Sequence, residues 1–266
     1  MANDRCLYSS ILCSVVVMLL GLSSMVVSTK DLQRWNILSP KRDRSKYSLK
    51  NYCESWRMNV ELNNLRDFNV VPGECIFYIS KYMTSTQYNV DQERAVEEAL
   101  VHLTALQLAG DGKDAWIFDV DDTLLSTLPF FKQHSYGGEP IEKDALESWM
   151  EQMKAPAVEA VLPLYNQLKM SGVKIIIITW RSERLRDVTA QNLVQVGFTG
   201  WTQLIMSRGD SDNGKSVTSY KSAKREALVK DGYRILGNVG DQWSDVLGTK
   251  AGIRTFKLPN SMYYSA

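Results

Sequence analysis

Residues 115–123 read AWIFDVDDT, and this stretch decides the fold of the chain. It begins as a short apolar run and ends in acidic side chains, which is typical of a strand that is buried on both faces and leads into a polar loop. Four further apolar runs follow, at residues 174–178, 203–206, 234–239 and 253–256. Helices are predicted between the runs, at about residues 157–171, 183–196, 220–231 and 243–251.

Glycines stand where three of these helices are expected to end, at Gly172, Gly197 and Gly232. Glycine readily adopts the left-handed conformation that ends many helices. Buried strands that alternate with helices imply an α/β fold, in which helices cover both faces of a parallel sheet. Ligands bind such sheets at the carboxyl ends of the strands, so the polar residues that follow the apolar runs are the candidates for chemistry.

Asp119 and Asp121 follow the first of these strands, and their spacing points both carboxylates in related directions if the backbone stays extended. Clustered carboxylates repel each other, so such a site favours a cation, and hard oxygen ligands suit Mg²⁺. One carboxylate can attack phosphorus as a nucleophile, and its neighbour can act as a general acid if nearby negative charge raises its pKa. A turn of solvated aspartates has the same pattern, so the motif alone is a weak signal.

The other strand ends carry complementary groups. Thr179 and Arg181 follow the second strand and are good donors to phosphate oxygens, although Thr179 also suits a helix N-cap. Asp241 and Asp245 follow the fourth strand, where they can complete a metal site or simply favour a helix N-terminus. Lys221 opens the preceding helix and can neutralise a phosphoryl group. Each feature alone favours the simpler structural explanation, but their joint occurrence in this order favours a catalytic site.

The composition excludes several classes of protein. The chain has 266 residues with 31 basic and 30 acidic side chains, a formal net charge of +1. This near-balance argues against a protein that coats nucleic acid, because it offers no basic excess for phosphates. A hydrophobic content of 44% and a charged content of 23% are typical of a globular protein.

The N-terminus has the anatomy of a targeting segment. Arg5 precedes an apolar run over about residues 11–22, and small residues follow it, so residues 1–28 are predicted to form a secretory signal peptide. The alternative is a membrane anchor over residues 7–27, which is nearly long enough to span a bilayer. After cleavage no stable membrane anchor is expected.

Helices are also predicted ahead of the first strand. Residues 29–52 are polar and basic and are expected to form an extended arm. Within residues 53–112, apolar side chains recur at helical intervals over residues 54–68. A second helix is predicted to begin at an N-cap of Asn89 and to end near Gly110.

Two cysteines, Cys53 and Cys75, remain after removal of the predicted signal peptide. An even pair in an oxidising compartment is a disulfide candidate, with two buried free thiols as the alternative.

The full set of motifs resembles a known family. The order DxDDT, strand-Thr, Lys and GDxxxD resembles the haloacid-dehalogenase superfamily of phosphotransferases. Three longer stretches sharpen the likeness to the plant acid phosphatase and vegetative storage protein family, a class B-type acid phosphatase group. They read CESWRMNVELNNLRDFNVVPGEC (residues 53–75), WIFDVDDTLLSTLPFF (116–131) and YKSAKREALVKDGYRILGNVGDQWSDVLG (220–248).

The resemblance implies an architecture and a disposition of roles. It implies a Rossmann-like core over residues 113–266, with a small helical cap at about residues 127–157 and the N-terminal helices packed on the core. It makes Asp119 the nucleophile, Asp121 the general acid and base, and Lys221 the balancing cation, with Lys224 as a less favoured substitute.

The resemblance also implies a metal site and a substrate site. Mg²⁺ would be bound by Asp119, Asp241 and the backbone carbonyl of Asp121, with Asp245 orienting its water shell. The phosphate would be held by the following side chains: Thr179, Arg181 and Lys221. The cap contributes His134 and three aromatic residues, Phe130, Phe131 and Tyr136, which either shape a pocket for the leaving group or simply pack the cap.

The chain departs from the family at one position, because it reads Thr-Trp-Arg where the family reads Thr-Gly-Arg, with Trp180 in the place of the glycine. The resemblance implies a Mg²⁺-dependent acid phosphatase that hydrolyses small phosphomonoesters through an aspartyl-phosphate, and that doubles as a storage protein. It also implies a secreted or vacuolar location and a homodimer, and no nucleic-acid partner is expected. The alternative is a storage or defence protein with little or no phosphatase activity.

Overall fold

The computed structural model describes residues 48–207, 212 and 214–265. The predicted signal peptide and most of the predicted arm lie outside these residues. The last part of the predicted arm is helical instead, because helix α3 (Leu49–Glu61) begins at Leu49. Ser48 caps this helix, since its Oγ accepts a hydrogen bond of 3.2 Å from the backbone N–H of Asn51.

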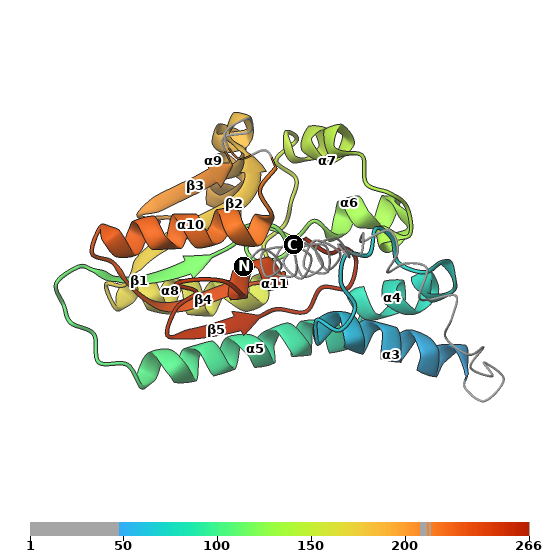
Figure 1. Cartoon of the computed structure of the whole chain (residues 1–266), viewed down its shortest axis with the longest axis horizontal. Helices are drawn as coiled ribbons and strands as arrows, with labels where there is room; N and C mark the ends of the chain where they lie inside the picture. The colour runs from blue at the N-terminus through green and yellow to red at the C-terminus, as the bar shows by residue number, and fades with distance from the viewer. Residues whose placement is uncertain (1–47, 208–211, 213, 266) are drawn as a thin grey trace, which may run out of the picture. The chain divides into compact units, whose positions relative to one another are not determined.

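The core is a five-stranded sheet in which every pairing is parallel, in the order β3-β2-β1-β4-β5 (Figure 1). The strands are β1 (Asp114–Phe118), β2 (Lys174–Ser182), β3 (Gln203–Ser207), β4 (Arg234–Gly240) and β5 (Arg254–Lys257). All five predicted strands are therefore confirmed, as is the α/β class. Strand β2 continues beyond its apolar run, so Thr179 lies inside the strand rather than after it.

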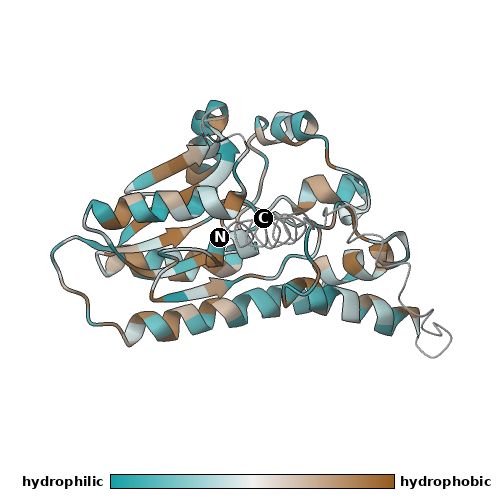
Figure 2. Ribbon diagram, viewed as in Figure 1, coloured by the Kyte–Doolittle hydropathy of each residue, from teal (hydrophilic) through white to brown (hydrophobic). Residues whose placement is uncertain are grey.

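Alternate side chains of the strands face two different layers. Trp116 and Phe118 of β1 pack with α5 (Thr86–Thr104), α8 (Leu162–Met170) and α9 (Arg186–Gln195). Ala115 and Ile117 face the opposite side and pack with α10 (Val217–Lys230). Figure 2 shows hydrophobic and hydrophilic residues side by side along α5 and α10, as expected of helices with one face on a sheet. This is the covered parallel sheet that the continuous apolar runs predicted.

Helix boundaries differ from the predictions in several places. The helix expected over residues 54–68 is α3, which ends at Glu61. The helix expected from Asn89 begins earlier, because Ser85 is its N-cap and accepts a hydrogen bond from the N–H of Tyr88. It ends at Thr104, well before the glycine near which its end was expected. Two elements between these helices, η3 (Gly73–Cys75) and α4 (Ile76–Met83), were not predicted.

The last predicted helix, over residues 243–251, is a single turn, α11 (Trp243–Val246). The helix ends here because Arg225 of α10 bonds to backbone carbonyl oxygens that a longer helix would use. Its guanidinium donates to the carbonyl oxygens of Asp245, at 2.7 Å, and of Thr249, at 3.1 Å. Gly248 follows with a positive φ of 85°, a conformation that glycine adopts without steric cost.

Between β1 and α8 the chain forms α6 (Leu128–Gln133), η4 (Ser135–Gly137) and α7 (Lys143–Met150), where a cap is expected. Phe130 and Phe131 of α6 pack with the N-terminal helices and with Met262 of the C-terminal segment. Arg184, in η6 (Glu183–Leu185), donates to Glu147 and Glu151 of α7, so charged pairs join the cap to the core.

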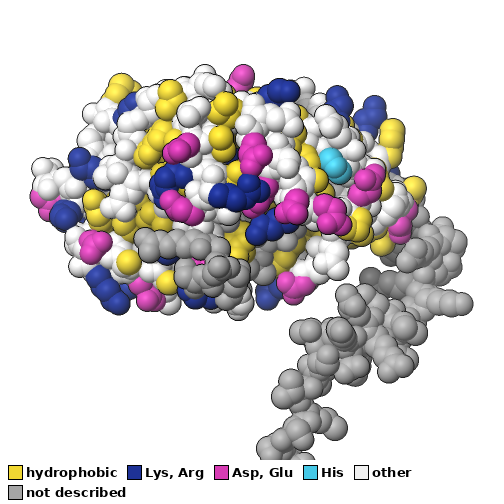
Figure 3. All heavy atoms as spheres, turned by 90° about the horizontal axis from the view of Figure 1, so that it is seen from above, with side chains coloured by type: hydrophobic (Ala, Val, Ile, Leu, Met, Phe, Trp, Pro, Cys, Tyr) yellow, Lys and Arg dark blue, Asp and Glu magenta, His cyan; other side chains and the backbone are white. Residues whose placement is uncertain are grey.

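Cys53 of α3 and Cys75 of η3 form a disulfide, which confirms the predicted bond. On the face seen in Figure 3, basic and acidic side chains are interspersed. Within the described ranges, no helix combines the length and the apolar character needed to cross a membrane.

Candidate active site

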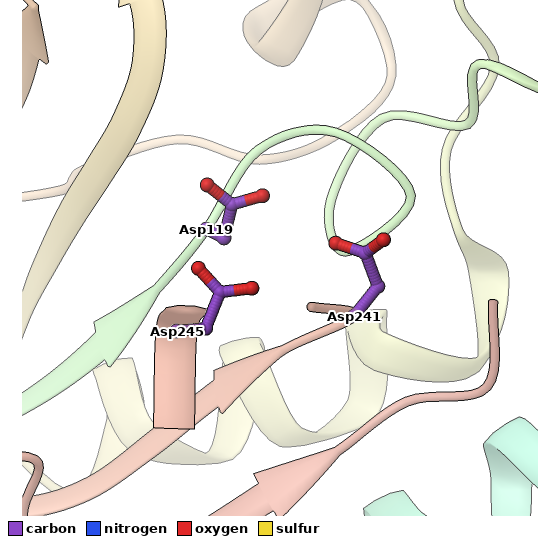
Figure 4. A group of neighbouring side chains, drawn as sticks. All are labelled: Asp119, Asp241 and Asp245. Carbon is purple, nitrogen blue, oxygen red and sulfur yellow. The ribbon is translucent and has the colours of Figure 1, made fainter. Parts of the chain in front are cut away.

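Three buried aspartates meet at the carboxyl edge of the sheet. Asp119 directly follows β1, Asp241 directly follows β4, and Asp245 lies in α11 one turn further on (Figure 4). One carboxylate oxygen of each lies within 4.8 Å of the others. The parallel order of β1 and β4 brings together residues that are more than 100 positions apart in the sequence.

Gly240 makes this close approach possible. A Cβ at this position would lie 2.2–2.3 Å from the side chain of Asp245, far inside van der Waals contact. Asp245 in turn accepts a hydrogen bond of 2.9 Å from the backbone N–H of Gln242, which closes the turn between β4 and α11. The glycine of the GDxxxD motif is therefore required by packing, not only by the flexibility of a turn.

Lys221 of α10 lies between two of the aspartates. Its Nζ is 2.6 Å from Oδ1 of Asp119 and also donates to Asp245. Lys224, which the sequence left as a substitute, instead lies over the ring of Tyr220, with its Nζ 5.0 Å from the ring centroid. Lys221 is thus the lysine that faces the acidic cluster.

Burial and mutual repulsion perturb the acids. Burial raises the pKa of Asp119 to about 7, against the lowering effect of Lys221. Burial, reinforced by Asp245 and Asp119, raises the pKa of Asp241 well above its usual range. Although burial lowers the pKa of Lys221, the neighbouring Asp119 and Asp245 raise it above its usual range, so the lysine stays charged. The cluster carries more negative charge than one lysine balances.

Asp121 and Arg181 form a second charged pair at the same edge. The guanidinium Nε of Arg181 lies 3.1 Å from both carboxylate oxygens of Asp121, and an Nη lies 2.7 Å from Oδ1. Its other Nη donates to Thr189 at 3.1 Å. Arg181 is 5% exposed, so this guanidinium is committed to protein partners at the edge of the site. A pair that is joined by several hydrogen bonds fixes the direction of both side chains.

The remaining predicted residues have different surroundings. Thr179 is fully buried, and its Oγ1 accepts a hydrogen bond of 3.2 Å from the N–H of Arg181. Trp180 points to the α10 side, where its ring meets Tyr220 edge-on at 5.0 Å. His134 stacks on Phe130 at 4.1 Å, and its Nδ1 lies 2.9 Å from the carbonyl oxygen of the same residue. The structure therefore does not bring His134 to the acidic cluster.

Several polar residues at the site were not identified from the sequence. Asp122 belongs to the DxDDT motif, but the motif predicted no role for it. Its side chain is fully buried, and burial raises its pKa to about 6. Gln242, Asn260 and Tyr263 donate hydrogen bonds to the carboxylate of Asp241. No periodicity marks these positions, because the C-terminal segment contributes side chains without regular structure.

A cavity of about 290 Å³ opens onto this cluster. Asp119, Asp121 and Lys221 lie at its polar end. Its walls are mainly apolar and come from the cap, from β2 and from the C-terminal segment: Phe131, Ile141, Leu146, Met150, Trp180 and Tyr263. Thr179, His134 and Asp245 are not among its lining residues. A charged group fits at the cluster and an apolar group fits against the walls.

The donor set fits a divalent cation. The three carboxylates of Asp119, Asp241 and Asp245 supply hard oxygen ligands from a shared, buried volume. Three carboxylates face a single lysine in this cluster, and a divalent cation would supply further positive charge. The residues present are therefore suited to bind such an ion.

Comparisons with known proteins identify relatives of the chain. A family model described as "HAD superfamily, subfamily IIIB (Acid phosphatase)" matches residues 41–266. Acid phosphatase 1 of Solanum lycopersicum is 46% identical over 212 residues, which cover 80% of this chain and 83% of that protein. Vegetative storage protein 1 of Arabidopsis thaliana is 42% identical over 216 residues, which cover 80% of this chain and 78% of that protein.

A solved structure supports the fold alone. The structure of the Class C acid phosphatase from Bacillus anthracis is similar, with a TM-score of 0.58 at 18% identity. The match covers 81% of this chain and 86% of that chain.

Proposed function

The chain belongs to the acid phosphatases that form subfamily IIIB of the HAD superfamily, and from this premise we propose that it is a Mg²⁺-dependent phosphatase of small phosphomonoesters that works through an aspartyl-phosphate on Asp119. The observation that carries the proposal is the buried cluster in which Lys221 lies 2.6 Å from Asp119, at the polar end of the cavity.

In the first step, a carboxylate oxygen of Asp119 attacks the phosphorus atom, and the bond from phosphorus to the alkoxide oxygen breaks. Asp121 gives its proton to that oxygen, so the product leaves as a neutral alcohol. Lys221 offsets the negative charge that Asp119 and the phosphoryl group bring together.

In the second step, water attacks the phosphorus atom of the aspartyl-phosphate while Asp121 takes up the proton that the water loses. The bond between phosphorus and Asp119 breaks, which releases inorganic phosphate and regenerates the carboxylate of Asp119 and the protonated acid of Asp121. Asp121 therefore acts as acid and then as base, and its bidentate contact with Arg181 holds it in place for both transfers.

We assign metal binding to Asp119, Asp241 and the backbone carbonyl of Asp121, with Asp245 orienting metal-bound water. When bound, Mg²⁺ supplies a positive charge that reduces repulsion between Asp119 and the phosphate. Thr179 and the main chain at the end of β2 are assigned to the phosphate. Arg181 contributes mainly through Asp121, because its guanidinium is already bonded there.

We further propose that the protein resides in the secretory pathway, either outside the cell or in the vacuole. The disulfide between Cys53 and Cys75 supports this location, because such bonds persist in oxidising compartments.

The test is hydrolysis of p-nitrophenyl phosphate with Mg²⁺ and with a chelator, for the parent protein and for Asp119→Asn. The parent should lose its activity on chelation, and Asp119→Asn should reduce kcat by at least about 1,000-fold because no covalent intermediate can form. Asp187→Asn, at an exposed aspartate of α9, is the matched control and should retain full activity. A variant Asp119→Asn that hydrolyses the substrate at the parent rate would overturn the proposed mechanism.

Storage is a second candidate function, because a relative at 42% identity is a vegetative storage protein. An active phosphatase can also serve as a nitrogen store, so the two functions are compatible. High abundance of the protein together with activity no greater than that of Asp119→Asn would favour storage alone.

A further inference from the structure

The carboxylate of Asp241 is held on one side only. Its Oδ2 accepts hydrogen bonds from Gln242 Nε2 at 2.8 Å, Asn260 Nδ2 at 2.7 Å and the hydroxyl of Tyr263 at 3.2 Å. Its Oδ1 takes a single long bond, 3.4 Å from Oγ1 of Thr123. Gln242 and Asn260 occupy this oxygen, which also shares the single proton of the Tyr263 hydroxyl with Oδ2 of Asp122, and the other oxygen keeps its lone pairs for a ligand.

Two of these donors come from the C-terminal segment, residues 258–265, and also contact a second buried carboxylate. The hydroxyl of Tyr263 lies 2.9 Å from Oδ2 of Asp122, and Asn260 Nδ2 lies 3.4 Å from the same oxygen. The side chains of Asn260 and Tyr263 therefore stand between two acids, one from the loop after β1 and one from the end of β4. Neutral donors reduce the repulsion between these acids without adding a positive charge that would compete with a cation.

Asp122 itself is satisfied by its own loop. Its Oδ1 accepts the backbone N–H of Thr127 at 2.9 Å, and its Oδ2 accepts the hydroxyl of the same threonine. This carboxylate is therefore a fixed anchor for the C-terminal segment.

The C-terminal segment is held firmly against the site. Asn260 and Met262 are each 1% exposed, and the Oδ1 of Asn260 accepts the N–H of Met262 at 2.9 Å, which turns the amide nitrogen toward the carboxylates. The ring of Tyr263 stacks on Phe131 of α6, with ring centroids 4.9 Å apart and planes 18° apart. Tyr263 therefore touches a candidate metal ligand through its hydroxyl and the cap through its ring, and it also lines the cavity.

We propose that Asn260 and Tyr263 are positioning residues of the metal centre, which orient Asp241 so that its Oδ1 is presented to the cation. The inference rests on the proposed metal-dependent function. Partners that orient a metal ligand commonly affect metal affinity by about 10–100-fold, even though they do not touch the ion. Through the stacking on Phe131, the same tyrosine connects the orientation of Asp241 to the cap.

The adjacent tyrosines provide a matched test. Tyr263→Phe removes only the hydroxyl that faces the acids, whereas Tyr264→Phe removes a hydroxyl that bonds to Asn63 at 3.2 Å. We expect Tyr263→Phe to weaken Mg²⁺ binding, measured by calorimetry without substrate, by about 10-fold, and Tyr264→Phe to leave it unchanged. With saturating Mg²⁺, Tyr263→Phe should recover most of the parent kcat, because the lost contact acts on occupancy of the metal site.

Asn260→Ala is a second variant and should weaken Mg²⁺ binding in the same direction. Thermal unfolding without metal checks that each variant is folded. If the parent binds Mg²⁺ and both Tyr263→Phe and Asn260→Ala bind it within about twofold of the parent, the positioning role is wrong. If the parent itself does not bind Mg²⁺, the proposed metal dependence fails, and the positioning role fails with it.

Discussion

Trp180 stands where the resemblance leads us to expect a glycine, and its surroundings explain how the chain accommodates so large a residue. Side chains alternate along β2, so Trp180 faces α10 while Thr179 and Arg181 face the other side of the strand. The indole ring packs edge-on against Tyr220 and forms part of the cavity wall. The tryptophan therefore adds an apolar surface to the cavity wall rather than filling the space next to Thr179.

This placement predicts a change of specificity in Trp180→Gly. Loss of an aromatic contact costs about 1 kcal/mol, so we expect kcat/KM for p-nitrophenyl phosphate to fall by roughly fivefold to tenfold. For glycerol phosphate, whose leaving group is polar, kcat/KM should change by less than about twofold. Trp180→Phe keeps an aromatic wall and should retain the preference. Equal losses for both substrates would show that the tryptophan acts on the fold and not on the leaving group.

Among the elements, the N-terminal helix α3 is held in place by its packing against other segments and by a disulfide bond. Helix α3 packs its buried face, Trp56 and Val60, against α4 and the C-terminal segment. The disulfide between Cys53 and Cys75 joins α3 to η3 across 22 positions of sequence. Residues 62–72, between these two elements, belong to no helix or strand, so the covalent link restricts the unfolded chain more than it adds contacts in the folded one.

We predict that the double substitution Cys53→Ala and Cys75→Ala lowers the free energy of unfolding by about 3 kcal/mol, the value expected for a closed loop of this length. Urea unfolding followed by circular dichroism measures this change. The parent protein in reducing buffer provides the control and should show a similar loss. Unchanged stability in both experiments would contradict the stabilising role of the bond, and the activity of the folded fraction should be unaffected.

At the scale of the whole molecule, the end of helix α3 contacts β5 and the C-terminal segment that reaches the site. Glu61, at the end of α3, accepts a bond of 2.9 Å from Lys257 of β5 and one of 3.0 Å from the hydroxyl of Ser261. Glu61 and Lys257 are each 15% exposed at the side chain, so water screens this ion pair only in part. The N-terminal helices thus help to hold the C-terminal segment that reaches Asp241.

Glu61→Ala should therefore destabilise the protein more than an ordinary surface substitution. It leaves Lys257 and Ser261 without their partner in a partly buried place, which costs about 1–3 kcal/mol. Glu97→Ala is the matched control, because Glu97 pairs with Arg94 where both side chains are more than half exposed, and this loss should be below about 0.5 kcal/mol. Equal effects of the two substitutions in urea unfolding would contradict the structural role of Glu61.

The physical origin of each feature explains how far the sequence could predict it. The five strands were predictable because a buried parallel strand is a continuous apolar run, a local signal. The start of α5 after Ser85 was not, because Asn89, a residue type that favours N-caps, lies inside the helix. The single turn of α11 was not either, because Arg225 bonds to carbonyl groups that a longer helix would use. Helix α4 was missed although its buried residues, Ile79, Tyr82 and Met83, have helical spacing, because the helix is only eight residues long and an exposed apolar residue, Phe77, obscures the pattern.

The sequence by itself determined the α/β class, the family and the acids at the strand ends, because each depends on local pattern or on a specific motif. Only the tertiary structure decided that Lys221 faces the cluster, that Arg181 is bonded to Asp121, and that Asn260 and Tyr263 reach Asp241. These contacts join segments far apart in the chain, and their energy depends on distance and burial in space. No local pattern records such distances, so packing alone selects which polar residues become part of the site.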